Sequence, residues 1–278
     1  MTKILSGKEC SLFYKEQLKK EIEKIEKKLK LAVIRIGNDS ASEIYVNSKK
    51  KACLEIGIDC EEIHFDDSVT NETVINKIKE LNNNDDVTSI LVQLPIPKHL
   101  NTHEIINTIN YKKDVDGLTT INIGKLNNNE NGIIPATPKG IMSMLDYYDI
   151  NVEGKNVVVI GRSNLVGKPL IPLLLSKNAT LTICHSKTKD LHEYTQKADI
   201  LISAVGKKEF ITCNMIKKDV IIVDVGINRF NGKIYGDGAF ENVLPLCSAI
   251  TPVPGGVGVM TVTSLLMNIV ECYKLLNN

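Results

Sequence analysis

The fold of this chain is decided by the stretch Val157-Val158-Val159-Ile160-Gly161-Arg162-Ser163-Asn164-Leu165-Val166-Gly167-Lys168-Pro169. An apolar run of β-branched residues ends there in a glycine turn, and an apolar helical pattern follows. That is the strand–turn–helix context of a dinucleotide site. The spacing departs from G-x-G-x-x-G, because Ser163 stands at the second glycine position and Val166 at the third. A plain connection between a strand and a helix of a parallel sheet explains the same turn, so both interpretations stay open at this point.

The next strand pattern, 179–184, indicates which nucleotide such a site would take. An NAD site places Asp or Glu at the end of this strand, where it bonds the ribose 2′-hydroxyl. His185-Ser186-Lys187-Thr188 stands there instead, and Arg162 in the glycine turn adds a planar set of donors that suits a 2′-phosphate. The sequence therefore predicts NADP as cofactor. The alternative is that Arg162 and Lys187 are solvated surface cations.

Strand-like and helix-like patterns alternate along the chain, which is typical of α/β folds with parallel sheets. Ligands bind beyond the carboxyl ends of such strands, although a glycine at a strand end also serves the turn alone. The chain passes from one α/β layer to a second near 136–140 and again near 252–260, and the last helix is expected to pack back on the first half. We expect strands at 31–36, 87–93, 157–160, 179–184, 198–205 and 220–225, helices at 42–56, 70–82, 138–148 and 260–276, and mostly loop at 107–135.

Charge and cysteine content argue against several classes of protein. The 278 residues carry a formal net charge of +1, which gives no bias toward nucleic acid or a membrane surface. None of the seven cysteines forms C-x-x-C, the amino terminus has no apolar leader, and glycines interrupt the apolar stretch 252–270. His99 and His103 lack a third metal ligand. We therefore expect a cytoplasmic protein with reduced thiols, no metal, and no nucleic-acid or membrane partner.

Lys49 is the member of a three-lysine run that falls on the apolar stripe of the helix expected at 42–56, one turn after Tyr45. Burial disfavours the charged form of a lysine, and a neutral lysine can act as a general base. The plainer alternative is a lysine that reaches from the edge of the stripe into solvent. Gln93 offers an amide at a strand end. The segment Asp114-Val115-Asp116-Gly117 offers a carboxylate beside a turn, or its acids simply form that turn.

Five segments together resemble the bifunctional methylenetetrahydrofolate dehydrogenase/methenyltetrahydrofolate cyclohydrolase family, the FolD type. Two positions depart from the family pattern: Val259 stands where the family commonly has Pro, and Ala136 where it often has Cys, which puts only loop detail in doubt. The five segments follow one another in order: Tyr45-Val46-Asn47-Ser48-Lys49-Lys50-Lys51-Ala52-Cys53, Val92-Gln93-Leu94-Pro95-Ile96-Pro97, Lys113-Asp114-Val115-Asp116-Gly117, the glycine turn from Gly161 to Pro169, and Pro252-Val253-Pro254-Gly255-Gly256-Val257-Gly258.

The resemblance implies two α/β domains with the active-site cleft between them, and usually a homodimer. Residues 1–139 plus 260–278 would form the folate-binding catalytic domain, and 140–259 a Rossmann-like NADP-binding domain. It implies NADP-dependent oxidation of 5,10-methylenetetrahydrofolate, followed by hydrolysis of the methenyl product to 10-formyltetrahydrofolate, as part of one-carbon metabolism.

The resemblance also assigns roles to residues of this chain. Lys49 would be the key residue of the hydrolysis, and Gln93 would tune its proton state. Tyr45 would stack on the folate, and Asp116 would hold the pterin ring. The contacts implied with the nucleotide are Gly161, Arg162, Ser163, Ser186 and Ile227, and those along the folate are Gly255, Gly256 and Val257.

Three alternatives stay open at the level of sequence. A dehydrogenase that has lost the hydrolysis would be expected to lack Lys49. A shikimate-dehydrogenase-like NADP oxidoreductase would share the glycine turn but not Tyr45, Lys49, Gln93 and Asp116. A folate-binding scaffold without catalysis would bind the ligand and not turn it over.

Overall fold

The structure is a computed structural model that describes residues 2–277, apart from the side chains of residues 40 and 41, and it divides into two compact units. The six-stranded unit comprises Met1–Phe13 and Thr137–Thr261, and the three-stranded unit comprises Tyr14–Ala136 and Val262–Asn278. The amino-terminal residues correct the expected boundary, which placed them with the first half. They belong to the six-stranded unit because β1 (Lys3–Ile4) pairs in parallel with β11 (Cys247–Ile250).

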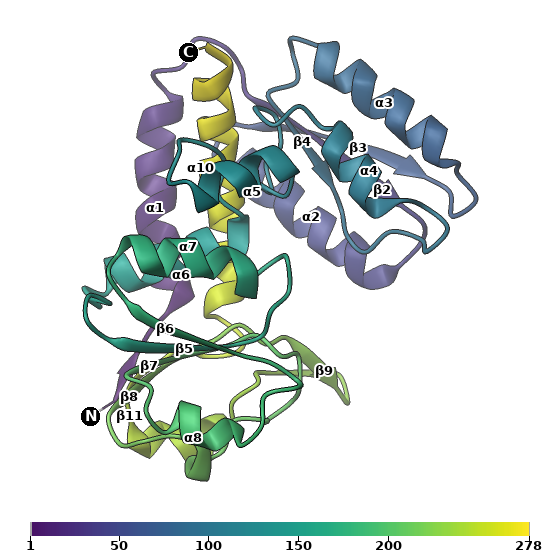
Figure 1. Cartoon of the computed structure of the whole chain (residues 1–278). Helices are drawn as coiled ribbons and strands as arrows, with labels where there is room; N and C mark the ends of the chain where they lie inside the picture. The colour runs from purple at the N-terminus through teal and green to yellow at the C-terminus, as the bar shows by residue number, and fades with distance from the viewer. Residues whose placement is uncertain (1, 278) are drawn as a thin grey trace. The chain divides into compact units, whose positions relative to one another are not determined.

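The three-stranded unit is built on a parallel sheet in the order β3-β2-β4, with helices on both faces (Figure 1). Alternate residues of the central strand point to opposite faces, as a period of two requires. Leu31 and Val33 join the cluster formed with helices α2 and α10, whereas Ala32 and Ile34 join the cluster formed with α3 and α4. The strands are β2 (Lys30–Ile36), β3 (Asp59–Phe65) and β4 (Ser89–Val92), and the helices are α1 (Gly7–Ile22, in part), α2 (Ser40–Glu55), α3 (Asn71–Asn83), α4 (Thr102–Thr108), α5 (Thr120–Asn127) and α10 (Val257–Asn277, in part).

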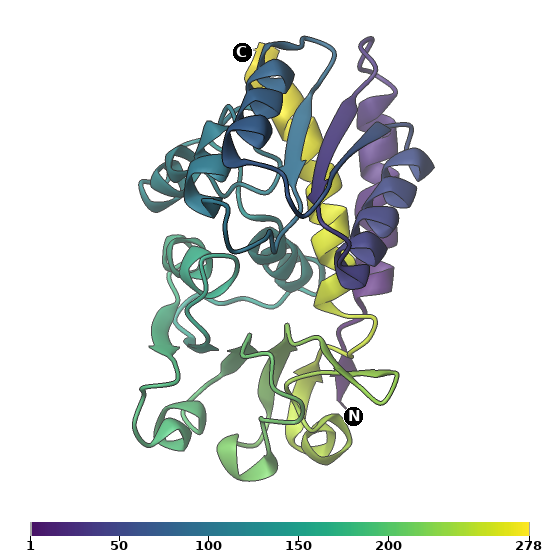
Figure 2. The same cartoon turned by 90° about the vertical axis from the view of Figure 1, so that its right-hand side faces the viewer.

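Helix α10 packs into the three-stranded unit beside α1, as both views show (Figures 1 and 2). Leu265, Leu266 and Ile269 are fully buried there, and Lys274 Nζ lies 2.9 Å from Glu21 Oε1. This confirms that the last helix packs back on the first half. The helix is long and apolar enough to cross a membrane by length and composition, but half of its most apolar window is buried inside the protein. Core helices have the same pattern.

The six-stranded unit carries a parallel sheet in the order β1-β11-β8-β7-β5-β6. Figure 1 shows α6 and α7 over one face of this sheet and α8 over the other. Strand β5 pairs with β6 on one side and with β7 on the other, so the chain changes direction across the sheet at β5. Such a switch point is where open α/β sheets bind ligands. The elements are α6 (Ala136–Tyr147), β5 (Asn156–Ile160), α7 (Gly167–Ser176), β6 (Thr180–Cys184), α8 (Leu191–Thr195), β7 (Ile200–Ser203), β8 (Val220–Asp224), the hairpin β9 (Asn228–Phe230) and β10 (Lys233–Tyr235), and α9 (Phe240–Val243).

The expected strands and helices are confirmed to within a few residues. Residues 107–135 are mostly loop, as expected, but they also contain α5, which was not predicted. Thr119 starts this helix, because its side chain accepts a hydrogen bond from the Asn122 backbone N–H. Asn122 is fully buried. The asparagine-rich composition of the segment concealed a helix that is fixed by a cap and by a buried amide.

Candidate active site

Lys49 lies on the buried face of α2 and directs its amine toward the end of β4. Only 8 % of Lys49 is exposed, whereas Lys50 is half-buried and Lys51 is exposed. Lys49 Nζ donates a hydrogen bond to Gln93 Oε1 at 3.0 Å. The lysine therefore points into the unit rather than out into solvent, and it meets the strand-end amide that the sequence singled out.

The Gln93 amide has one orientation that satisfies both of its neighbours. Its Nε2 donates to the Leu94 carbonyl oxygen at 2.7 Å, and a carbonyl can accept only from the NH₂ side of an amide. Oε1 must then face Lys49. Because Gln93 is itself 9 % exposed, this pair of bonds fixes the direction of the lysine amine and occupies one of its N–H groups.

Tyr45 precedes Lys49 by one turn of α2 and is an exposed aromatic side chain. About a third of the residue, 37 %, is accessible. Neighbours four apart share one side of a helix, so an accessible ring lies along the helix from the buried amine. An accessible ring of this kind offers a surface on which a flat heteroaromatic ligand can stack.

The two carboxylates of the segment 114–116 have different environments. Asp114 is 1 % exposed, and its Oδ2 accepts hydrogen bonds from the Thr119 backbone N–H at 2.8 Å and from Asn122 Nδ2 at 2.9 Å. The turn-forming alternative therefore describes Asp114. Asp116 is partly exposed, so it is the more accessible residue of the two.

Buried polar side chains hold the backbone on both sides of Asp116. Asn268 of α10 is fully buried, and its Nδ2 donates to the Val115 carbonyl at 2.9 Å and to the Ile134 carbonyl at 2.8 Å. Lys113 Nζ donates to the Asn84 carbonyl at 2.7 Å, and burial lowers the pKa of this lysine. The segment is therefore anchored from two directions, and the position of Asp116 is set by the unit's core.

Burial has the largest effect on the pKa of Asp116, and the charge of Lys49 has the next largest. Burial raises the pKa of Asp116, the nearby Lys49 charge lowers it, and the Asp114 charge raises it. The coupling means that Lys49 and Asp116 act on each other electrostatically. The three-stranded unit thus brings Tyr45, Lys49, Gln93 and Asp116 together, as expected from the sequence.

The glycine turn after β5 sits tightly between two neighbouring strands. Gly161 has φ 129°, and a Cβ added there would lie 2.6 Å from the Ala204 carbonyl oxygen. A Cβ on Gly167 would lie 2.1 Å from the Gly161 carbonyl oxygen. The backbone of the turn therefore passes close to itself and to the end of β7, and α7 begins directly behind it, as a phosphate site requires.

We predict that Gly161→Ala raises the KM for the nucleotide at least about tenfold and lowers the melting temperature. The added Cβ would force the turn off the Ala204 carbonyl and impose a backbone conformation that L-residues avoid. Steady-state kinetics and thermal melts measure both effects. Gly124→Ala is the matched control, because a Cβ there meets nothing within 4 Å; an equal effect of both substitutions would contradict this account.

The polar residues expected to contact a nucleotide are accessible. Arg162, Ser163 and Ser186 are exposed. Ser163 also builds the turn, since its Oγ accepts a hydrogen bond from the Val166 backbone N–H at 3.1 Å. The loop after β6 presents Ser186 and no acid from His185 to Thr188.

The remaining expected contacts lie at the ends of β8 and β11 in the six-stranded unit. Ile227 is 42 % exposed, and its Cδ1 would lie 3.3 Å from a Cβ on Gly258. The Gly255 carbonyl accepts a hydrogen bond from the Gly7 backbone N–H at 2.8 Å. Val257, which begins α10, is buried, and Gly256 is buried as well. The glycine-rich loop and Ile227 therefore adjoin one another.

Two buried acids of the six-stranded unit were not singled out by the sequence analysis. Asp224 ends β8, and Asp237 lies between Gly236 and Gly238. They are 5 % and 0 % exposed, respectively. An acid at a strand end and an acid between two glycines were the available signals.

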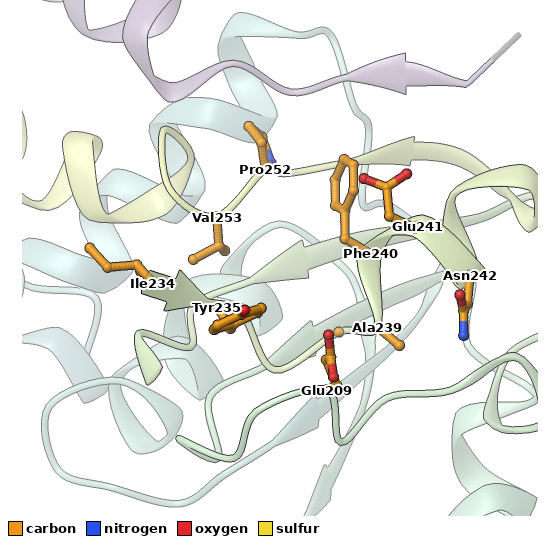
Figure 3. Close-up of a pocket in the computed structure, with 11 residues that line it drawn as sticks. Glu209, Ile234, Tyr235, Ala239, Phe240, Glu241, Asn242, Pro252 and Val253 are labelled. Carbon is orange, nitrogen blue, oxygen red and sulfur yellow. The ribbon is translucent and has the colours of Figure 1, made fainter. Parts of the chain in front are cut away.

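A pocket of about 440 Å³ lies beside these acids in the same unit (Figure 3). None of the sequence-predicted site residues is among the described residues that line it. Its walls include Tyr235, Phe240, Glu209 and Val253. The pocket borders the glycine-rich loop through Pro252 and Val253.

Among residues 2–277, no group of three or more His, Cys, Asp or Glu side chains is arranged to hold a metal ion. Within that part of the chain the polar groups that converge are an amine, an amide and carboxylates. The chemistry they offer is proton transfer and hydrogen bonding.

Comparisons with known proteins point in one direction. Residues 5–116 match the model of the tetrahydrofolate dehydrogenase/cyclohydrolase catalytic domain, and residues 135–277 match the model of the tetrahydrofolate dehydrogenase/cyclohydrolase NAD(P)-binding domain. The Bifunctional protein FolD of Aquifex aeolicus is 50 % identical over 279 residues, covering 99 % of this chain and 96 % of the relative.

Solved structures agree with these matches. The bifunctional FolD methylenetetrahydrofolate dehydrogenase/cyclohydrolase from Campylobacter jejuni has a TM-score of 0.96 at 45 % identity, covering 99 % of both chains. The Trypanosoma brucei enzyme, solved with NADP cofactor and inhibitor, has a TM-score of 0.93 at 30 % identity, covering 98 % of this chain and 97 % of that one. A shikimate dehydrogenase from Aquifex aeolicus, at TM-score 0.53 and 16 % identity over 90 % of this chain and 98 % of that one, shares the fold alone.

Proposed function

The chain belongs to the tetrahydrofolate dehydrogenase/cyclohydrolase family, and from that premise we propose how its own residues divide the family's two reactions between them. The enzyme oxidises 5,10-methylenetetrahydrofolate with NADP and hydrolyses the methenyl product to 10-formyltetrahydrofolate. We assign the hydrolysis and the folate site to Tyr45, Lys49, Gln93 and Asp116 of the three-stranded unit, and the nucleotide site to the switch point of the six-stranded sheet.

The residues at that switch point fit NADP. The glycines let the turn pack closely against the end of β7 and the start of α7, and the N-terminus of α7 favours an anion such as pyrophosphate. Arg162 and Ser186 are accessible donors for the 2′-phosphate, and no carboxylate from His185 to Thr188 would repel it. When bound, NADP⁺ supplies the acceptor for the hydride that leaves the methylene carbon. The protein's part in this step is to bind and orient.

The hydrolysis needs a group that accepts a proton from water. Methenyltetrahydrofolate is a cation with an electrophilic carbon between two nitrogens, so water can attack it without a metal. In our proposal Lys49, as the neutral amine, donates one N–H to Gln93 and takes a proton from the attacking water through its lone pair. A C–O bond forms and gives a neutral hydroxyl adduct. The bond from that carbon to N5 then breaks, N5 takes up the proton that Lys49 accepted, and the hydroxyl loses its own proton as the formyl C=O forms. The result is the 10-formyl product and one released proton.

One folate site serves both steps in this proposal. Tyr45 stacks on the ring system, and Asp116 accepts hydrogen bonds from the pterin. The observation that carries the proposal is the 3.0 Å bond from the buried Lys49 amine to Gln93 beside an accessible tyrosine and an accessible carboxylate. It favours the bifunctional enzyme over a dehydrogenase without hydrolysis, because the residue such an enzyme would lose is present and oriented.

A spectrophotometric assay with methylenetetrahydrofolate and either nucleotide tests the proposal. We expect nucleotide reduction with NADP⁺ at a kcat/KM at least about tenfold above that with NAD⁺, one charge-assisted hydrogen bond being enough for that ratio. A protein that binds folate without reducing either nucleotide would be a scaffold. Equal kcat/KM for the two nucleotides would mean that Arg162 and Ser186 do not recognise the 2′-phosphate.

We predict that the KM for methylenetetrahydrofolate rises as the pH falls through the pKa of Asp116. Burial raises that pKa above the ordinary value for aspartate, so the loss occurs at a higher pH than it would for a solvated carboxylate. The sign follows because the pterin donates N–H groups, which only the ionised carboxylate accepts fully. KM is measured against pH for the parent and for Asp116→Asn. The KM of Asp116→Asn should exceed that of the parent at every pH at which the parent carboxylate is ionised, and it should lack this pH dependence. An identical pH profile in both proteins would assign the titration to another group.

We further infer a cytoplasmic homodimer without nucleic-acid or membrane partners. The supporting observations are the net charge of +1, the seven free cysteines and the resemblance itself. Light scattering of the purified protein measures the oligomeric state, and a monomeric mass at assay concentration would contradict the dimer.

A further inference from the structure

Asp237 makes hydrogen bonds to two strand-end segments at once. Its Oδ2 accepts from Ser203 Oγ at 3.1 Å, from the Val205 backbone N–H at 2.7 Å and from the Gly206 backbone N–H at 3.3 Å. Its Oδ1 accepts from the Lys207 backbone N–H at 2.9 Å and from Asn228 Nδ2 at 3.1 Å. Five donors, four from the end of β7 and the residues after it and one from the start of β9, therefore converge on one fully buried carboxylate.

Asp224 holds Asp237 and the neighbouring backbone in the same way. Its Oδ1 accepts from the backbone N–H groups of Gly226 and Asp237, each at 2.9 Å, and its Oδ2 accepts from the Gly238 backbone N–H at 2.8 Å. We call Asp224 and Asp237 the acid pair. Desolvation raises the pKa of Asp224 to about 6, against the effect of these bonds. Burying two acids together is costly unless their acceptor oxygens are satisfied, and here eight hydrogen bonds from the surrounding donors satisfy them.

The backbone that the acid pair fixes is the backbone that borders the glycine turn. The Ala204 carbonyl lies against Gly161, where a Cβ would approach to 2.6 Å. Gly226 lies against the Asp237 carboxylate, where a Cβ would approach Oδ1 to 2.2 Å. Asn228 also contacts the Asp237 carboxylate, through its side-chain amide. The residues on both sides of position 227 therefore lie against Asp237. The exposed side chain at that position is Ile227.

We infer that Asp237, supported by Asp224, is a positioning residue for NADP: it sets the backbone of 204–207 and 226–228, which form the edge of the nucleotide site beside the glycine turn. The inference rests on the proposed nucleotide role of this edge and deepens it. A carboxylate suits the task because it only accepts, and all five of its partners are donors.

The test is Asp237→Asn, which keeps the shape and turns one acceptor oxygen into an NH₂ group that faces donors in either orientation. We expect the Kd and KM for NADP to rise at least about tenfold, the cost of leaving one or two buried donors unpaired. Hydrolysis of methenyltetrahydrofolate, assayed without nucleotide, should stay within about twofold of the parent. Asp219→Asn is the matched control, since it makes the same chemical change at an exposed position of the same unit.

A merely structural role would lower the melting temperature and leave the NADP Kd of the folded protein unchanged, and that result would overturn the inference. If Asp237→Asn does not fold, Asn228→Ala decides, because it removes one donor and keeps the acid pair: a severalfold rise in the NADP Kd supports the inference, and an unchanged Kd refutes it. A parent enzyme that does not bind NADP would instead refute the proposed function, so the two failures are distinguishable.

Discussion

Lys49→Met is expected to abolish enzymatic hydrolysis of methenyltetrahydrofolate, with a loss of at least about 10²-fold, the usual contribution of a general base. The variant should stay folded and still bind NADP. Methionine keeps most of the length and apolar surface of the lysine stem, so the α2 stripe on which Lys49 lies retains its packing. What is lost is the amine that donates to Gln93. The absorbance of the methenyl substrate follows the reaction directly, without nucleotide present.

Lys51→Met is the control for this prediction. It makes the same chemical change on the same helix two residues on, but at an exposed position. Hydrolysis should remain close to the parent rate. Gln93→Ala should act in the same direction as Lys49→Met and less strongly, because the amine is kept and only its orientation is released. Hydrolysis by Lys49→Met at the parent rate would mean that water is activated elsewhere.

Arg162→Ala is expected to weaken the binding of NADP⁺ far more than the binding of NAD⁺. A charge-assisted hydrogen bond to the 2′-phosphate contributes about 1.5–3 kcal/mol, or roughly 10- to 150-fold in affinity. NAD⁺ lacks that phosphate and should lose little. The measurement is kcat/KM for both nucleotides with methylenetetrahydrofolate, and hydrolysis of the methenyl substrate serves as the internal control because it needs no nucleotide.

Lys187→Ala tests the alternative that exposed cations near the site act only through general charge. Lys187 follows Ser186 and is exposed, as Arg162 is. If both alanine variants weaken NADP⁺ and NAD⁺ equally, the cations raise the local anion concentration and do not recognise the 2′-phosphate.

The sequence predicted the parts of the site that lie on, or directly beside, a helix or strand with a regular apolar pattern. Lys49 could be separated from Lys50 and Lys51 because a helix places residues 49, 52, 53 and 56 on one face, and the structure buries Lys49 accordingly. The turn at Gly161 was predictable because a strand pattern ended and a helical pattern began around it. Periodicity and turn chemistry are local, so one chain suffices to read them.

The parts that depend on distant backbone could not be predicted. Asp237 is separated from Ser203 by 34 positions, and Asn268 from Val115 by 153. No local pattern reports that an acid will accept hydrogen bonds from a distant strand end, or that an amide will donate to a distant carbonyl. The short strand β1 was missed for the same reason, since only pairing with β11 makes it a strand. Asp114 and Asp116 could not be ranked from sequence, because burial distinguishes them.

One progress curve tests the central claim most directly. The purified protein is mixed with methylenetetrahydrofolate and NADP⁺, and NADPH, methenyltetrahydrofolate and 10-formyltetrahydrofolate are followed together in the same sample. The account predicts that NADPH accumulates, that the methenyl species stays low, and that 10-formyltetrahydrofolate appears at the rate of NADPH formation once a steady state is reached. The contradicting result is that NADPH forms while methenyltetrahydrofolate accumulates and disappears no faster than it does without enzyme.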